Sequence, residues 1–319
     1  MKQRVSSSYA ASATSIALTT AVISTCILCW LDKVNRTVVD PYLDEVFHVR
    51  QSQTYWRHQW SQWDPKITTP PGLYLLSYLL GAVGFLISRK PTILSASYLR
   101  SLNGLVLFNS LPILLRNLLR SIWAVTDSSV SENSNLVPEE SNWAFSLTAL
   151  NICLFPPIFF FSGLYYTDLA ALLIVLEVYR QDLKRPSYSK NSLWKTVFSY
   201  QTALFTLSGI TSLIFRQTNI FWVAVFLGGL RVIKTIRSVH TETQVSAINA
   251  VIESSWKDRK LYDPLVSDAA FEDYFKAGVS IGIAAAANIC IVLAELLPYL
   301  MVLGSFGLFV LWNGSVVLG

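Results

Sequence analysis

Long apolar segments recur along the sequence, and they constrain its fold more than any other feature. They lie near residues 10–30, 70–88, 92–115, 143–162, 163–179, 197–214, 216–230, 277–297 and 299–317. Many approach the roughly 20 residues that a helix needs to cross a bilayer core. Because 52% of the residues are hydrophobic and only 14% are charged, the composition does not suit a soluble domain. The pattern predicts an all-α integral membrane protein, a single polytopic bundle of about eight or nine transmembrane helices.

Basic residues gather in two connectors between these segments. The first connector holds Arg180, Lys184, Arg185, Lys190 and Lys195, and the second holds Arg231, Lys234, Arg237, Lys257, Arg259 and Lys260. Positively charged loops stay preferentially in the cytosol, so we expect both connectors there, the second covering residues 231–276. Basic residues spread over loops do not form a continuous stripe with interleaved aromatics, so no nucleic-acid partner is expected despite the net charge of +5.

The first apolar segment follows Lys2 and Arg4, which predicts a signal anchor with a cytosolic N-terminus. Residues 31–69 then form a loop on the opposite side of the membrane. If every apolar segment crossed, the basic connector at residues 180–195 would share that side, so one segment is expected to be re-entrant or misassigned. Two proline pairs predict broken helices that line a cavity, Pro70 with Pro71 and Pro156 with Pro157.

The loop after the first segment contains the sequence DPYLDEVFH at residues 40–48. Asp40 can cap a short helix and Pro41 can begin it. Asp44 and His48 would then lie one turn apart on one face, where a carboxylate and an imidazole can together manage the proton of a hydroxyl nucleophile. Alternatively, the acidic residues only complement the positive end of the helix dipole.

Two further polar positions stand out. Asp64 precedes Pro65 in SQWDPKITTPPG, just before an apolar segment begins, and this order predicts a turn. The sequence LYYTD places Tyr166 and Asp168 at a tight bend between two apolar segments. Asp168 either caps the following helix or faces the same cavity as Asp44, and the spacing leaves both alternatives open.

The polar group FRQTNIFW interrupts apolar sequence at residues 215–222. Polar side chains are costly in hydrocarbon, so Arg216 is expected to face a cavity or a partner, where its fork of donors suits a phosphate. Gln217 and Asn219 can then bind neighbouring hydroxyl groups. Alternatively, Arg216 snorkels from a helix end towards the interface. The same group decides whether residues 197–230 form two short helices or one tilted helix.

The segments DPYLDEVFHVRQSQTYW, SQWDPKITTPPGLYLLS, LYYTD and FRQTNIFW resemble, in this order, the Die2 or Alg-ten family of endoplasmic reticulum glucosyltransferases. The resemblance covers Asp40 to Trp222 and continues more loosely to the final LWNGSVVLG. It implies a multi-pass enzyme of the GT-C type in the endoplasmic reticulum membrane. Such an α-1,2-glucosyltransferase moves glucose from dolichyl phosphate glucose onto the diglucosylated dolichyl-diphosphate oligosaccharide, Glc2Man9GlcNAc2-PP-dolichol.

The resemblance also implies roles for individual residues. Asp44, with its neighbour Glu45, matches the catalytic acidic residue of the family's first lumenal loop, here residues 31–69. Under this hypothesis Asp44 is the general base for the acceptor 2-hydroxyl, and the sugar inverts by single displacement. Arg216 receives the departing phosphate, while Gln217 and Asn219 position the sugar or the phosphate. The other predicted substrate-binding residues are His48, Asp64, Tyr166 and Asp168.

Two expectations limit this hypothesis. Family members continue beyond the position of Gly319, so we expect a truncated form that lacks part of the acceptor groove and can be inactive. A non-catalytic polytopic transporter or channel-associated protein would also use a buried arginine and aspartate, although the sequence lacks the paired broken helices of two related halves. With three histidines and no nucleotide, zinc or Ser-His-Asp signature, the sequence predicts no metal or cofactor.

Overall fold

The computed structural model describes residues 2–88, 94–126, 139–186, 198–242, 247–258 and 260–318, and most of them are helical. The helices are α1 (Lys2–Thr37), α2 (Glu45–Trp56), α3 (Gly72–Ser88), α4 (Ala96–Leu105), η1 (Val106–Ser110), α5 (Leu111–Thr126), α6 (Glu139–Cys153), α7 (Pro156–Ser162), α8 (Asp168–Lys184), α10 (Tyr200–Phe215), η2 (Phe221–Leu227), α11 (Gly228–Val239), α12 (Ile248–Lys257), α13 (Phe271–Ala287) and α14 (Ile289–Asn313). Two short strands, β1 (Thr241–Glu242) and β2 (Lys260–Leu261), pair in parallel.

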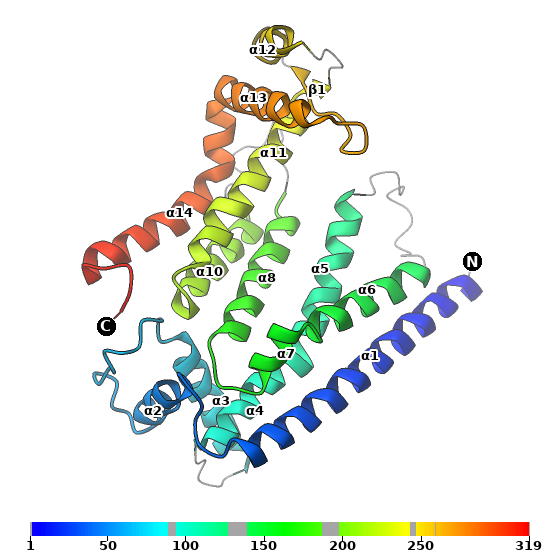
Figure 1. Cartoon of the computed structure of the whole chain (residues 1–319). Coiled ribbons are helices and arrows are strands. Elements are labelled where there is room, and N and C mark those ends of the chain that lie inside the picture. The colour runs from blue at the N-terminus through cyan, green and yellow to red at the C-terminus, as the bar shows by residue number, and fades with distance from the viewer. Residues whose placement is uncertain are drawn as a thin grey trace.

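The molecule has two structurally different ends (Figure 1). α2 and its flanking loops lie at one end together with α3 and α4, and we call this the α2 end. α12, α13 and β1 lie at the opposite end, which we call the α12 end. α5, α8, α10 and α11 run between the two ends, and α8 packs against both α5 and α10. These four helices therefore form the body of the molecule between the two ends.

Among the described residues, 3 helices are long and apolar enough to cross a membrane, Ala13–Thr37, Ala96–Ala124 and Ile289–Asn313. The number becomes 4 if Asn142–Cys153 and Pro156–Ser162, which are bent by 65° against each other, form one broken span. The protein is thus a helical membrane protein, as predicted, but the expected eight or nine spans are not confirmed. Gly72–Ile87 is a shorter apolar helix.

The break predicted at the second proline pair is confirmed. Pro156 begins α7 directly after the bend that ends α6. A proline ring cannot continue a helix from the preceding turn, although it fits the first turn of a new one. The first proline pair behaves differently, because Pro71 only precedes the start of α3 at Gly72 and breaks no helix.

Residues 197–230 form two helical pieces rather than one tilted helix. α10 ends at Phe215, and Arg216 is extended with φ −159° and ψ 127°. The chain then turns, and helix resumes through η2 and α11. The polar group predicted to be expensive in hydrocarbon therefore coincides with the bend between the two pieces.

The predicted boundary between residues 277–297 and 299–317 is wrong. α13 ends at Ala287 and α14 begins at Ile289, so Pro298 lies inside α14. Membrane helices tolerate an internal proline when neighbouring groups satisfy the freed backbone carbonyl. The proline therefore does not mark a helix end here.

α3 packs against α2. Leu73 at its start and Leu94 beyond its end belong to one buried cluster with Val49 of α2. Gly81 in the middle of α3 faces the ring of Trp56, which also belongs to α2. α2 and α3 thus share buried contacts at the start and in the middle of α3.

The two basic connectors begin side by side. Arg231 of α11 donates a hydrogen bond to the Pro186 carbonyl at 2.6 Å. The stretch 231–276, predicted as one connector, contains the end of α11, α12, both strands and the start of α13. Outside the described residues lie three of the predicted basic positions, Lys190, Lys195 and Arg259.

Candidate active site

The start of α2 differs from the predicted one and leaves one carboxylate free. α2 begins at Glu45 with Asp44 as its N-cap residue, so the expectation that Asp40 caps a helix starting at Pro41 is wrong. Leu43 has a positive φ of 50°, and this bend leads the chain into the helix. Asp44 makes no side-chain capping hydrogen bond. Its exposed carboxylate is therefore available to the cavity beside it.

This cavity, which we call the polar cavity, has a volume of about 360 Å³. Five of the predicted site residues line it, namely Asp44, His48, Tyr166, Asp168 and Arg216. They come from α2, from the bend before α8, from the first turn of α8 and from the end of α10. Sequence reasoning missed four other polar residues of the lining, Lys66, Thr68, Thr69 and Thr167. Their places in the SQWDPKITTPPG and LYYTD motifs were the only available signal.

Glu45, the second predicted catalytic carboxylate, is fully buried and points elsewhere. Arg100 donates to its Oε1 at 3.0 Å and to its Oε2 at 2.7 Å. The backbone N–H of Tyr165 donates to Oε1 at 2.6 Å, and that of Tyr42 donates to Oε2 at 2.9 Å. Both oxygens are thus engaged, and Glu45 does not line the polar cavity. Glu45 is therefore a buried, fully hydrogen-bonded carboxylate that lies outside the polar cavity.

His48 lies one turn after Asp44 and lines the same cavity, as their spacing predicted. Its Nδ1 lies 2.6 Å from the Tyr74 hydroxyl oxygen, and its ring centre lies 5.8 Å from that of Tyr166. Burial lowers the pKa of His48 below its ordinary value, although the nearby carboxylates of Asp44 and Asp168 raise it. A neutral imidazole beside a free carboxylate can hydrogen-bond a substrate hydroxyl.

Three predicted substrate-binding residues do not line the polar cavity. Asp64 forms the predicted turn and accepts a hydrogen bond from the backbone two residues later at 3.0 Å. Gln217 Nε2 donates to the Thr68 carbonyl at 2.6 Å. Asn219 Nδ2 donates to the Ser212 carbonyl at 2.9 Å. All three side chains bind backbone, and Asn219 also lines a neighbouring apolar groove. Gln217 ties the bend after α10 to the wall of the cavity.

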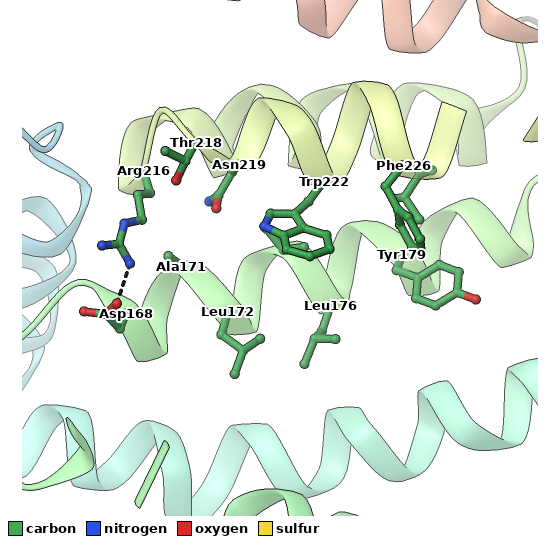
Figure 2. Close-up of a pocket in the computed structure, with 12 residues that line it drawn as sticks. Asp168, Ala171, Leu172, Leu176, Tyr179, Arg216, Thr218, Asn219, Trp222 and Phe226 are labelled. Carbon is green, nitrogen blue, oxygen red and sulfur yellow. Dashed lines mark hydrogen bonds and ion pairs between the residues drawn. The ribbon is translucent and has the colours of Figure 1, made fainter. Parts of the chain in front are cut away.

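An apolar groove of about 450 Å³ adjoins the polar cavity (Figure 2). It runs between α8 and η2, and its apolar walls include Leu172, Val175, Leu176, Tyr179, Trp222 and Phe226. Arg216 and Asp168 line both the groove and the polar cavity. The two spaces therefore meet at these two residues.

Arg216 and Asp168 form an ion pair at this junction, in which Arg216 Nη1 donates to Asp168 Oδ1 (Figure 2). Their side chains are 39% and 35% exposed. Thr167 is the N-cap residue of α8, so Asp168 faces the cavity, the second of its two predicted alternatives. Arg216 likewise faces a partner and a cavity, rather than snorkelling away from them.

The polar cavity combines the groups needed to bind an anion beside a proton acceptor. Arg216 and Lys66 contribute positive charge, and Asp44 offers an exposed carboxylate. Across the described part of the chain, no group of three His, Cys, Asp or Glu side chains is arranged to hold a metal ion. Positively charged side chains and a free carboxylate therefore line the same cavity.

Comparison with known proteins relates this geometry to a family. Residues 38–319 match the sequence model of the DIE2/ALG10 family. A protein from Aspergillus fumigatus is 47% identical over 290 residues, and one from Emericella nidulans is 46% identical over 290 residues. A protein from Arabidopsis thaliana is 30% identical over 324 residues. All three bear the name Dol-P-Glc:Glc(2)Man(9)GlcNAc(2)-PP-Dol alpha-1,2-glucosyltransferase.

The chain spans about half the length of the curated relatives it matches. The alignments cover 91% of this chain but 44% and 45% of the two fungal relatives, and they cover 90% of this chain but 56% of the plant relative. No solved structure matches the chain significantly.

Proposed function

The chain belongs to the DIE2/ALG10 family, and on this premise we propose that it transfers the terminal α-1,2-linked glucose in N-glycan precursor assembly. The donor is dolichyl phosphate glucose and the acceptor is Glc2Man9GlcNAc2-PP-dolichol. The names of the fungal and plant relatives support this pair of substrates. One observation carries the proposal: a polar cavity containing Asp44 meets an apolar groove at Arg216. A lipid-linked sugar phosphate needs such a combination.

The transfer step follows from the cavity's proton acceptor. Asp44 accepts the proton of the acceptor glucose 2-hydroxyl, and the oxygen attacks the anomeric carbon of the donor glucose. The bond between the anomeric carbon and the phosphate oxygen breaks, and its electron pair leaves with dolichyl phosphate. A single displacement of this kind inverts the anomeric configuration. The exposed Asp44 carboxylate, which makes no capping hydrogen bond, supports this assignment.

The donor binds across the junction of the two spaces. Its phosphate lies at Arg216, whose guanidinium stabilises the charge that develops as the phosphate departs. Its isoprenoid chain occupies the apolar groove between α8 and η2, and its glucose extends into the polar cavity. His48 and Tyr166 bind sugar hydroxyls there. Gln217 and Asn219 act indirectly by holding the bend from which Arg216 projects.

The orientation in the membrane follows from the same assignment. We place the α2 end, with the catalytic loop at residues 31–69, in the lumen of the endoplasmic reticulum. The α12 end, with the basic residues of the stretch 231–276, then lies in the cytosol, in line with the preference of positive loops. The body between them is a GT-C-like multi-pass bundle.

Analysis of lipid-linked oligosaccharides tests the proposal in cells. Cells that lack the protein should accumulate the diglucosylated dolichyl-diphosphate oligosaccharide, and expression of this chain should restore the triglucosylated form. A transporter or channel-associated protein would leave the glucose number of the precursor unchanged. An unchanged precursor would therefore reject the glucosyltransferase assignment.

A further inference from the structure

The ion pair between Arg216 and Asp168 uses only part of the arginine. Arg216 Nη1 donates to Asp168 Oδ1, and within the described residues no other side-chain hydrogen bond of Arg216 is formed. A guanidinium has five N–H donors arranged in a planar fork. Most of that fork therefore remains free for a ligand.

The two partners stand on elements that fix their positions. Asp168 is the first residue of α8, where the positive end of the helix dipole favours a carboxylate. Arg216 follows α10 in an extended conformation, and its N–H donates to the Ser212 carbonyl at 3.2 Å. α8 and α10 pack against each other. The pair thus joins two packed helices at the point where the groove meets the polar cavity.

Asp44 and Asp168 differ in what they bind, although they share the cavity. Within the described residues, no Lys or Arg nitrogen lies within ion-pair distance of Asp44. Asp168 already binds the guanidinium of Arg216. Of the two carboxylates, Asp44 is the one left free to accept a proton from a substrate.

We propose that Asp168 is a positioning residue, which orients the Arg216 fork so that its remaining donors face the phosphate of a polyprenyl phosphate. This inference rests on the proposed function and replaces the predicted role of Asp168 in binding substrate directly. It explains why an acidic residue borders the place assigned to an anion. Asp168 holds one edge of the guanidinium, and the phosphate takes the other.

Binding of dolichyl phosphate to the full chain in detergent measures this role without requiring turnover. Asp168→Asn should weaken binding about tenfold, because the fork loses its fixed orientation while the arginine remains. Asp168→Glu, which keeps the carboxylate, should restore binding to within about threefold of wild type. Asp263→Asn is the matched control, since it breaks another Arg–Asp pair, with Arg237, and should leave binding unchanged.

A double-mutant cycle shows whether Asp168 acts through Arg216. Arg216→Gln should weaken binding, and adding Asp168→Asn to it should cause little further loss. Additive losses would overturn the proposal, as would tighter binding in Asp168→Asn, which is expected if the carboxylate only repels the phosphate. If Asp168→Asn fails to fold, the cycle is measured with Asp168→Glu instead. Its small loss of binding should then disappear in the Arg216→Gln background.

Steady-state transfer separates positioning from direct catalysis. Asp168→Asn should raise the KM for dolichyl phosphate glucose about tenfold and lower kcat by no more than about tenfold, because Arg216 also stabilises the departing phosphate. A fall in kcat as large as that of Asp44→Asn, with KM unchanged, would make Asp168 a catalytic residue and overturn the proposal. If wild type binds dolichyl phosphate but transfers no glucose, the proposed function fails while the binding result still decides the role of Asp168.

Discussion

Arg100 donates hydrogen bonds to both carboxylate oxygens of Glu45, and this buried pair fixes the backbone on which Asp44 stands. The same guanidinium donates to the carbonyls of Val38 at 2.6 Å and Asp40 at 3.1 Å. One arginine of α4 therefore holds the whole approach to α2. The free carboxylate of the site owes its position to the engaged carboxylate beside it.

Glu45→Gln should destabilise the protein by about 3–5 kcal/mol, because it leaves the Arg100 guanidinium buried without its counter-charge. Thermal or denaturant unfolding in detergent measures the loss. Glu253→Gln is the control, since Glu253 pairs with Lys257 on an exposed helix face, and its melting temperature should not change. Equal stability of Glu45→Gln and wild type would mean that the buried pair does not support the loop.

Arg216→Lys should reduce kcat/KM for transfer by about 10- to 100-fold, although it keeps the positive charge. The ammonium group lacks the planar fork that binds Asp168 and a phosphate together. Arg237→Lys, which alters an exposed ion pair at the α12 end, serves as the control and should retain activity. Undiminished transfer by Arg216→Lys would remove Arg216 from the site.

The protein should become less stable as the pH falls, because the folded state disfavours protonation of His48. Burial lowers the pKa of His48 in the folded protein below its ordinary value of 6.5. Above pH 6.5 the imidazole is neutral in both the folded and the unfolded chain, so it adds no pH dependence to the free energy of unfolding. As the pH falls below 6.5, the unfolded chain binds the proton first, and the free energy of unfolding decreases until the lower folded pKa is reached.

His48→Gln isolates this contribution. The difference in melting temperature between wild type and His48→Gln should change across the window below pH 6.5 and stay constant above it. Neighbouring groups that face the imidazole, Asp44, Asp168, Glu45 and Arg216, remain in both proteins. A wild type that gains stability relative to His48→Gln on acidification would show that His48 binds its proton more tightly when folded.

Gly72→Ala should destabilise the protein by about 1–3 kcal/mol through overpacking. A Cβ at Gly72 would lie 2.6 Å from the backbone oxygen of Ile214, at the end of α10. Backbone cannot swing aside, so α3 and α10 would have to separate. Gly278→Ala is the control, since a Cβ there meets nothing within 4 Å, and it should not destabilise α13. Equal effects of both substitutions would refute the close approach.

The sequence predicted five of the residues that line the polar cavity, because polar residues are conspicuous in apolar sequence. Polar residues are costly inside apolar sequence, so Arg216 and Asp168 stood out where they occurred. The prediction that Asp44 and His48 share one helix face is likewise confirmed, since residues four apart share a face wherever the helix begins. These predictions did not depend on knowing how the helices pack.

Other features depend on packing and could not be predicted from the sequence. Asp44 and Glu45 are adjacent carboxylates, and only the position of Arg100 decides which one is buried. Gln217 and Asn219 were predicted to bind ligand hydroxyls; their amide nitrogens donate to backbone carbonyls, while Asn219 also lines the apolar groove. The apolar groove has no sequence signal, because its walls on α8 and η2 consist of ordinary apolar residues.

Glucose transfer by the purified chain tests the central claim most directly. Wild type and Asp44→Asn are compared using labelled dolichyl phosphate glucose and the diglucosylated dolichyl-diphosphate oligosaccharide, with melting temperatures recorded for both. The account predicts transfer by wild type and a loss of about 100-fold or more in Asp44→Asn at unchanged stability. Equal transfer by the two proteins would contradict the assignment of Asp44 as the general base.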